Sequence, residues 1–236
     1  MIYFTSDLHF AHPFVAACRC YIDDDIVRRF KDKETKITYI KALYDSIGSD
    51  EFSKRCRTDI HDEKIIRNIN AVVGKRDELY IFGDISIGSA NAMQHALQML
   101  NELYVPRARR HLILGNHENF RLPEGIMMYA ASVFSTISTS LIEHIDGYSV
   151  VMAHMPDSDW YGARGIDFYR ETVEHGDHII SVHRSENVIC LHGHTHSSAF
   201  VDSPAGELRA YNVGLDAWNM KPVSWDDIDA LARYGV

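Results

Sequence analysis

Short apolar runs recur along the chain, and they predict the strands of the fold. Each run holds three to six residues and is rich in β-branched, aromatic or leucine side chains, a pattern typical of buried strands. The runs lie at residues 2–4, 78–82, 111–114, 148–153, 187–191 and 208–213. Longer stretches with helical periodicity separate several of them.

Three of these stretches predict helices. Residues 62–73 place their apolar side chains on one helical face, and Gly74 follows where a C-terminal cap belongs. Ser89 is placed to cap a helix over residues 90–103. The buried stripe of that helix is expected to be Met93, Leu97, Leu100 and Leu103. A last short helix is expected to start within "SWDD" at 224–227 and to run through Leu231.

The order of these elements predicts an α/β protein with mixed rather than purely parallel sheets. Strands alternate with helices early in the chain, whereas strands follow one another from residue 133 onward. Two stretches fit this alternation poorly. Residues 13–60 are charged and mostly helical in pattern, and residues 156–186 are polar and aromatic without a clear strand. We interpret both as insertions on one domain that spans residues 1–236.

Composition supports a single soluble domain. The chain has 236 residues, of which 46% are hydrophobic, enough for a sizeable core. It contains no run of roughly 20 apolar residues that could cross a membrane, and its start, "MIYFTSDLHF", lacks the features of a secretory signal. We therefore expect a cytoplasmic protein.

Charge and cysteine content exclude two other classes. The net charge of −9 argues against an extended nucleic-acid-binding surface, which would need clustered lysines and arginines. The four cysteines are too few and too irregularly spaced for a disulfide framework or a structural zinc site, so we expect free thiols at Cys18, Cys20, Cys56 and Cys190.

Polar motifs follow five of the predicted strands. Asp7-Leu8-His9 follows the first, Gly83-Asp84 the second, "GNHE" at 115–118 the third, His154 the fourth and "HGHTH" at 192–196 the fifth. Because sites in α/β sheets form at the carboxyl ends of strands, we expect these motifs to converge on one edge. The candidate ligands that they supply are Asp7, His9, Asp84, Asn116, His154, His194 and His196.

The side-chain types at these positions indicate divalent metal ions. They offer oxygen and imidazole nitrogen but no thiolate, a set suited to Mn, Fe, Zn or Ni. Seven donors are too many for one tetrahedral ion, and they suit two. Two ions about 3.5–4 Å apart, bridged by a carboxylate, can clamp the attacking and leaving oxygens of a displacement at phosphorus. Each motif alone is common in turns or surface tracts, and only the ordered set is specific.

This ordered set resembles the calcineurin-like metallophosphoesterase superfamily, and it is most similar to the small bacterial and phage members. The similar stretches include "FTSDLHFAH" at 4–12, "HLILGNHE" at 111–118, "VMAHMP" at 151–156, "VICLHGHTH" at 188–196 and "YNVGLDAWNMKPVSWDDI" at 211–228. The resemblance covers nearly the whole chain. It implies a four-layer αββα sandwich with a dinuclear metal centre.

The resemblance also implies how the ligands divide. One metal would be held by Asp7, His9 and His196. The other would be held by Asn116, His154 and His194, with Asp84 bridging the two. We expect two divalent ions, Mn²⁺ first, with Fe, Zn or Ni as alternatives.

The remaining motif residues receive roles from the same resemblance. His117 matches the catalytic histidine, which stabilises and protonates the leaving alkoxide while a metal-bridging hydroxide attacks phosphorus. Asp84 takes part in catalysis as the bridging ligand. Glu118 is expected to orient His117 or its loop. His192 is expected to pack beside the site or to support it rather than to bind a metal.

The sequence favours a phosphodiester substrate. Phosphoprotein phosphatases of this superfamily carry arginines where this chain has "GDISIG" and Leu114, and a monoester dianion needs such a bidentate clamp. Arg107, Arg109 and Arg110 precede a strand and so should lie at the edge opposite the metals. We therefore expect a small nucleotide-type diester. Candidate substrate contacts are His12, Arg121, Trp160, Tyr161 and Arg164.

Other functions remain open at this stage. A phosphomonoesterase or a nuclease of the same superfamily is one alternative. A non-catalytic scaffold with this fold is another, although such a scaffold would be expected to have lost ligands and none is missing here. A metalloprotease is excluded because H-E-x-x-H requires a histidine at 121, where Arg stands. Sequence leaves the physiological substrate, the native metal and the oligomeric state open.

Overall fold

Two mixed β-sheets form the centre of the protein in this computed structural model, which describes residues 1–118, 124–156, 187–201 and 209–234. The first sheet has the order β4 (Thr136–Ser138), β3 (Arg110–Ile113), β2 (Glu78–Ile81), β1 (Ile2–Thr5) and β9 (Val223–Ser224). The second has the order β5 (Ser140–Ile145), β6 (Tyr148–Ala153), β7 (Val188–His192) and β8 (Arg209–Asn212). Among the described strands, only β9 and β5 run antiparallel to the strand next to them. The predicted α/β class with mixed sheets is confirmed.

All six predicted strands are present, with bounds within one residue of the prediction. Three observed strands were not predicted. β4 and β9 are very short, and β5 carries Glu143 and His144 in a strand without a fully buried residue. Such strands are specified by pairing with a neighbour rather than by their own hydrophobic pattern.

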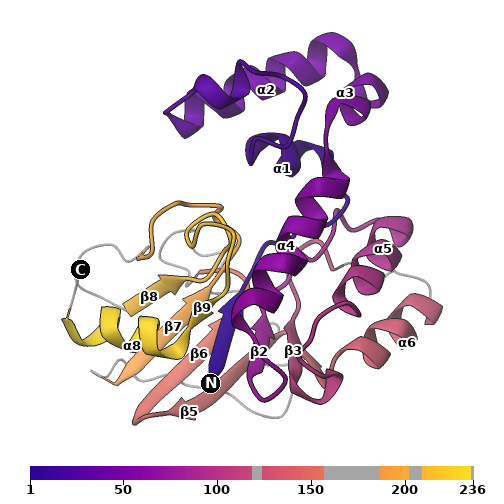
Figure 1. Cartoon of the computed structure of the whole chain (residues 1–236). Coiled ribbons are helices and arrows are strands. Elements are labelled where there is room, and N and C mark those ends of the chain that lie inside the picture. Colours follow the sequence, from indigo (N-terminus) through magenta and orange to yellow (C-terminus); the bar gives the residue numbers. More distant parts are fainter. Residues whose placement is uncertain (119–123, 157–186, 202–208, 235–236) are drawn as a thin grey trace.

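Helices α4 (Thr58–Val72), α5 (Ala90–Leu100) and α6 (Glu124–Val133) lie along one side of the first sheet (Figure 1). The predicted cap of α5 is confirmed, because the Ser89 side chain accepts a hydrogen bond from the Ala92 N–H at 3.3 Å. Met93, Leu97 and Leu100 form the predicted buried stripe, whereas the predicted extension to 103 is wrong: the helix ends at Leu100, and Leu103 is buried in the turn that follows it. Helix α6 was not predicted.

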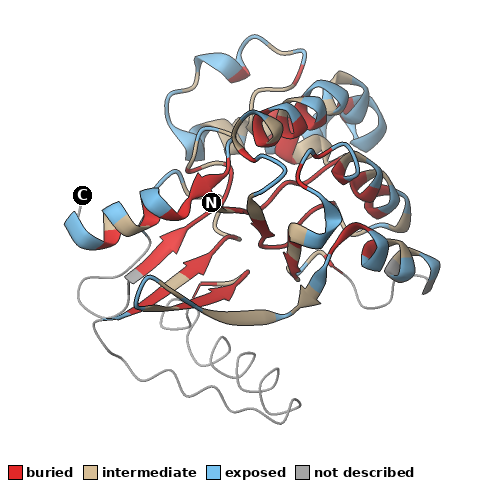
Figure 2. Cartoon of the chain, turned by 60° about the horizontal axis from the view of Figure 1, so that its bottom comes forward, coloured by how far each residue is buried: buried red, intermediate tan, exposed pale blue. Residues whose placement is uncertain are grey.

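The first sheet separates two apolar clusters because its strands alternate their side chains between two faces. Leu79 and Ile81 of β2 pack with the helices, whereas Tyr80 and Phe82 face the second sheet. Trp225 of the last helix, α8 (Trp225–Tyr234), joins the cluster between the sheets. Figure 2 shows the buried residues concentrated on the strands and on the helix faces that meet them.

Residues 13–60, which we interpret from the sequence as an insertion, form a helical segment with its own apolar cluster. It contains α1 (Pro13–Cys18), the 3₁₀ turn η1 (Val27–Arg29), α2 (Lys33–Ile47) and α3 (Ser49–Arg55). Its buried side chains include Ile22, Ile40 and Phe52. The insertion lies beyond the carboxyl end of β1 (Figure 1). The second predicted insertion, 156–186, lies outside the described residues from 157 onward.

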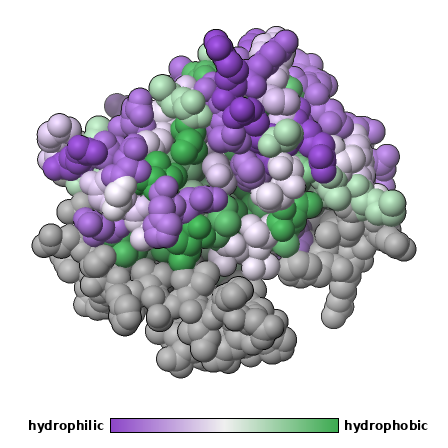
Figure 3. All heavy atoms as spheres, turned by 90° about the horizontal axis from the view of Figure 1, so that it is seen from below, coloured by the Kyte–Doolittle hydropathy of each residue, from purple (hydrophilic) through white to green (hydrophobic). Residues whose placement is uncertain are grey.

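The opposite end of the molecule shows hydrophilic side chains around apolar ones (Figure 3). At that end, the predicted basic cluster has structural partners. The buried Arg110 side chain donates to the carbonyls of Leu100, Leu103 and Val105, and Arg109 pairs with Glu78. None of the helices in the described part of the chain is long and apolar enough to cross a membrane.

Candidate dinuclear metal centre

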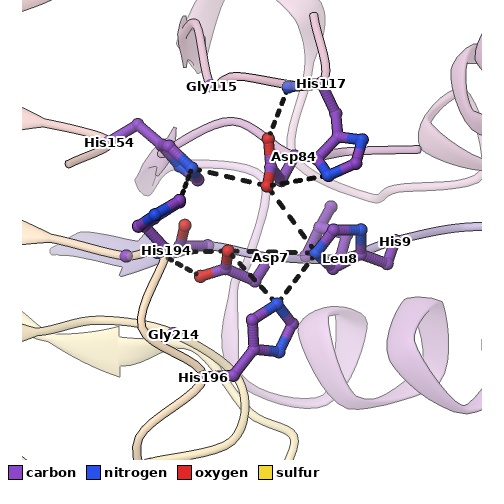
Figure 4. Close-up of polar contacts among 12 residues, drawn as sticks. Asp7, Leu8, His9, Asp84, Gly115, His117, His154, His194, His196 and Gly214 are labelled. Carbon is purple, nitrogen blue, oxygen red and sulfur yellow. Dashed lines mark hydrogen bonds and ion pairs between the residues drawn. The ribbon is translucent and has the colours of Figure 1, made fainter. Parts of the chain in front are cut away.

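The polar motifs of five strands meet at the carboxyl ends of both sheets. Asp7 and His9 follow β1, Asp84 follows β2, and Asn116 follows β3. From the second sheet, His154 follows β6 and the pair His194 and His196 follows β7. The strand ends therefore converge from two sheets rather than from the edge of one. Figure 4 shows six of these side chains pointing toward a common centre, namely Asp7, His9, Asp84, His154, His194 and His196.

The first ligand group combines residues that follow β1 with one from the loop after β7. It comprises Asp7, His9 and His196, whose ligand atoms lie within 4.8 Å of one another. His9 Nε2 lies 3.0 Å from His196 Nε2. Asp7 Oδ1 lies 4.0 Å from His9 Nε2 and 3.8 Å from His196 Nε2. Asp7 and His9 are almost completely buried.

The second ligand group lies on the other side of Asp84. Asp84, His154 and His194 place their ligand atoms within 4.8 Å of one another. Asn116 Oδ1 lies 3.0 Å from His154 Nε2 and 2.9 Å from His194 Nδ1. The Nδ1–H of His154 donates to the Phe82 carbonyl at 2.6 Å, so Nε2 is left to face Asp84 and Asn116.

Asp84 and His9 connect the groups. His9 Nε2 lies 3.7 Å from Asp84 Oδ2, and a third set of close ligand atoms comprises His9, Asp84 and His117. The four imidazoles and the amide oxygen of the two groups, beside buried carboxylates, are a donor set for divalent ions of the first transition row. Two linked groups offer room for two ions with Asp84 between them. The residues therefore fit a dinuclear centre.

The electrostatics of the site favour positive charge near the second group. Burial alone would lower the pKa of His154, but the carboxylates of Asp84 and Asp7 outweigh it and raise that pKa to about 9. The pKa of His9 moves the opposite way, because burial and the neighbouring His196 hold it well below its usual range. A cation bound among these groups would balance the negative charge of the Asp7 and Asp84 carboxylates, as a proton on His154 does.

The backbone at the candidate ligands is in an unusual conformation. Five of them have positive φ, namely Asp7 at 58°, His9 at 49°, Asp84 at 49°, His194 at 68° and His196 at 48°. Such values are uncommon for residues with a side chain, and they concentrate at functional sites where the surroundings enforce them. The sharp turns after the strands direct alternate side chains into the centre.

Glycines in the motifs allow the loops to approach closely. A side chain at Gly193 would collide with the Ser6 hydroxyl and lie 2.6 Å from Asp7 Oδ2. A side chain at Gly115 would lie 2.6 Å from the Asp84 nitrogen. The glycines of "GNHE" and "HGHTH" therefore allow loops that follow different strands to contact each other.

Glu118 supports the loops rather than His117. Its buried carboxylate accepts hydrogen bonds from the N–H groups of Gly115, Asp84 and Ile85 at 2.6–2.9 Å. This joins the loop after β3 to the loop after β2. From the sequence, Glu118 is expected to orient either His117 or its loop, and the geometry matches the second of these roles.

His117 lies at the open side of the centre. Its backbone N–H donates to Asp84 Oδ1 at 2.9 Å, and its side chain is 34% exposed. Its Nε2 lies 3.8 Å from Asp84 Oδ2, while Nδ1 lies 3.3 Å from the Ile87 carbonyl. This hydrogen bond orients the imidazole so that Nε2 faces the centre.

Two further histidines lie beside the centre. The ring of His12 is centred 5.2 Å from that of His9 and 6.3 Å from that of His117, and burial lowers its pKa to about 4. His192 is buried at the end of β7, with Nδ1 3.0 Å from the Gly193 carbonyl, and it belongs to none of the three ligand sets. The other predicted substrate contacts, Arg121, Trp160, Tyr161 and Arg164, lie outside the described residues.

Sequence reasoning missed three residues that contact the first ligand group. Asp216 accepts a hydrogen bond from His196 Nδ1 at 2.8 Å, and Arg19 pairs with Asp216. Lys33 of α2 donates to the His196 carbonyl. Asp216 lies within the stretch 211–228 that resembles the superfamily, but the charged character of the insertion gave no signal that singled out Arg19 or Lys33.

The comparisons with known proteins decide the family. The model of the calcineurin-like phosphoesterase family matches residues 1–218 of the chain. The chain belongs to the calcineurin-like phosphoesterase family. This membership supports metal-dependent hydrolysis of phosphoesters and a dinuclear centre of divalent metals, and the predicted family resemblance is confirmed.

Relatives of this calcineurin-like phosphoesterase occur in bacteriophages. It is 26% identical over 243 residues to the gene 66 protein of Mycobacterium phage L5, covering 98% of this chain and 94% of the relative. It is 30% identical over 233 residues to the gene 66 protein of Mycobacterium phage D29, covering 92% and 89%. Among solved structures, AQ665, a protein of unknown function from Aquifex aeolicus, has a TM-score of 0.57 with 21% identity, covering 98% of each chain. That likeness concerns the fold.

Proposed function

We propose that this protein is a dimetal phosphodiesterase that hydrolyses a small nucleotide-type diester, with Mn²⁺ as the preferred ion. The observation that carries the proposal is the connection of the ligand groups through His9 and Asp84. A single-ion site would need one of these groups, whereas two linked groups serve two ions that act on one phosphorus.

We propose the division of ligands that the family resemblance implies. Asp7, His9 and His196 would hold one ion, and Asn116, His154 and His194 the other, with Asp84 between them. Bound divalent ions would supply Lewis acidity to polarise the phosphoester and to activate a water molecule. The carboxylates and the fixed tautomer of His154 would hold these ions in place without rearrangement of the chain.

His117 is the proposed general acid. Its Nδ1–H donates to the Ile87 carbonyl, so in the protonated imidazole Nε2–H is the proton that can leave. That nitrogen lies 3.8 Å from Asp84 Oδ2, at the open side of the centre where a leaving oxygen would lie. His117 would deliver this proton to the alkoxide as its bond to phosphorus breaks.

The charges near the site, in the part of the chain that the structure describes, support a diester rather than a monoester. A monoester dianion is best held by a free guanidinium that binds two of its oxygens. The guanidinium of Arg19 is engaged by Asp216 and by backbone carbonyls, and Leu114 occupies a position where phosphoprotein phosphatases carry arginine. A diester, with one negative charge, depends less on such a clamp.

The first experiment compares His117→Ala with Asp84→Asn. We expect His117→Ala to keep both ions by elemental analysis and to lower kcat on an aryl phosphodiester by about 10²–10⁴-fold, the typical contribution of a general acid. Asp84→Asn should lose bound metal as well as activity. His144→Ala, an exposed histidine on β5, is the matched control and should behave as wild type. Wild-type turnover by His117→Ala would contradict the role of His117.

The second experiment addresses the substrate. Purified protein with Mn²⁺ is assayed on an aryl diester, an aryl monoester, cyclic and linear dinucleotides, cyclic mononucleotides and short oligonucleotides. We expect the highest kcat/KM on a small diester. A higher kcat/KM on the monoester would contradict the diesterase proposal and show that the protein is a phosphomonoesterase. Absence of both metal and hydrolysis would favour a scaffold.

A further inference from the structure

Arg19 connects the helical insertion to the candidate metal centre. It follows α1 and is the C-cap residue of that helix, and its side chain is only 4% exposed. Its NH2 group donates to the Asp7 carbonyl at 2.8 Å, and NH1 lies 3.3 Å from the Leu8 carbonyl. One guanidinium thus binds the backbone of the turn that carries two residues of the first ligand group.

The same guanidinium binds the carboxylate behind the third residue of that group. Arg19 Nε and NH2 contact the two oxygens of Asp216 at 3.1 and 2.8 Å, a bidentate pair. Asp216 Oδ2 also lies 2.8 Å from Nδ1 of His196. When Asp216 accepts this hydrogen bond, Nε2 of His196 carries the lone pair that faces His9 and Asp7.

The Arg19 guanidinium is itself held from the other side. NH1 lies 3.1 Å from His61 Nε2, and His61 Nδ1 lies 2.8 Å from Asp62 Oδ1. Asp62 accepts a further hydrogen bond from the Ala11 N–H at 2.9 Å, just after the Asp7–His9 turn. The buried side chains of α4 therefore fix both the arginine and the turn that it contacts.

We propose that Arg19 is a positioning residue that sets the geometry of the first ligand group, acting on Asp7 and His9 through their backbone and on His196 through Asp216. This inference rests on the proposed metal centre. Within the described residues, the hydrogen bonds of the Arg19 side chain go to Asp7, Leu8, His61 and Asp216, all outside the second ligand group. Loss of Arg19 should therefore affect one metal site and spare the other.

The test measures binding of Mn²⁺ to the metal-free protein by calorimetry. Wild type should show two binding steps, and Asn116→Ala identifies the step that belongs to the second group. In Arg19→Lys, one ammonium replaces five N–H donors and cannot maintain both the bidentate pair and the carbonyl contacts. We expect this variant to weaken the first-group step by about 10–100-fold, the usual cost of losing a partner behind a metal ligand. The second-group step should stay within about threefold.

Asp216→Asn provides an independent variant if Arg19→Lys does not fold. It keeps the size of the side chain but removes the charge, and it should weaken the same step as Arg19→Lys. The matched control is Arg57→Lys, which alters an exposed ion pair with Asp23 in the same insertion and should leave both steps unchanged.

The outcomes separate this inference from the proposed function. If wild type binds two ions and both steps weaken equally in Arg19→Lys and Asp216→Asn, or neither weakens, the positioning role is overturned and the metal centre stands. If wild type itself binds no Mn²⁺, the proposed function fails before Arg19 is tested. Selective weakening of the first-group step in both variants supports the inference.

Discussion

At the scale of single residues, His61 shows how a buried network can depend on one protonation state. Its Nδ1 lies 2.8 Å from a carboxylate oxygen of Asp62, and its Nε2 lies 3.1 Å from NH1 of Arg19. The guanidinium has only N–H donors to offer, so Nε2 must act as the acceptor and the imidazole must be neutral. Burial and Arg19 lower the pKa of His61 despite the opposing effect of Asp62.

The resulting pH dependence has a definite sign. A histidine whose pKa is lower in the folded state than in the unfolded state stabilises the fold at pH values above its unfolded pKa, which is about 6.5. This contribution is lost as the pH falls toward the folded pKa. We expect the free energy of unfolding of the metal-free protein to decrease as the pH is lowered below about 6.5. His61 should contribute at most about 1.4 kcal/mol per pH unit to this slope.

Urea unfolding at a series of pH values in excess chelator checks this expectation. His61→Gln removes the titrating group and should reduce the slope, whereas the exposed His144→Gln should leave it unchanged. Equal slopes for wild type and His61→Gln would show that His61 does not titrate differently in the folded protein.

At the scale of elements, the site depends on loops that touch. The loop after β7 passes so close to the end of β1 that Gly193 has no room for a side chain. A methyl group there would collide with Ser6 and approach the carboxylate of Asp7. Overpacking of this kind typically costs about 1–3 kcal/mol.

We therefore expect Gly193→Ala to lower the free energy of unfolding by about 1–3 kcal/mol and to weaken metal binding, because Asp7 must shift. Denaturant unfolding and calorimetry with Mn²⁺ measure the two effects. Gly125→Ala is the matched control, since no atom lies within 4 Å of the added carbon on α6. That variant should be neutral or more stable by up to about 1 kcal/mol. A Gly193→Ala protein as stable as wild type would refute the close approach.

The elements also show what the sequence could predict. Strands with strong apolar patterns, such as β6 and β7, were predicted because burial on both sides leaves a local signal. β5 and β9 depend on their partners, so their own residues say little. The rule that polar motifs after strands share an edge predicted that Asp7, Asp84 and His154 would lie close together, but it gave no sign that His154 would come from a second sheet. Arg19 could not be predicted, because its partner Asp216 is 197 positions away and a lone arginine in a charged insertion carries no pattern.

At the scale of the whole molecule, metal binding is expected to contribute to stability. An ion that binds the folded state alone stabilises it by about 2.7 kcal/mol when its concentration is 100 times Kd. For a chain of this size, each kcal/mol raises Tm by about 2–4 °C. Each filled site should therefore raise Tm by about 5–10 °C.

Thermal unfolding with chelator and with excess Mn²⁺ measures this shift. Asp84→Asn, which alters the residue between both ligand groups, should show a much smaller difference between the two conditions than wild type. A wild-type Tm that is insensitive to Mn²⁺ would argue against ions bound within the fold.

The long separation between partners in the first ligand group has a consequence for biosynthesis. His9 leaves the ribosome early, but His196 follows 187 residues later, and Asp216 later still. A fold dominated by such distant pairings forms slowly, because the chain must close long loops before it gains their contacts. During translation, β1 and its neighbour β2 are exposed before β7 and β9 exist. A nascent chain that stops before residue 196 therefore lacks a complete first ligand group, and it lacks β8, β9 and α8, which contribute to the apolar cluster around Phe4.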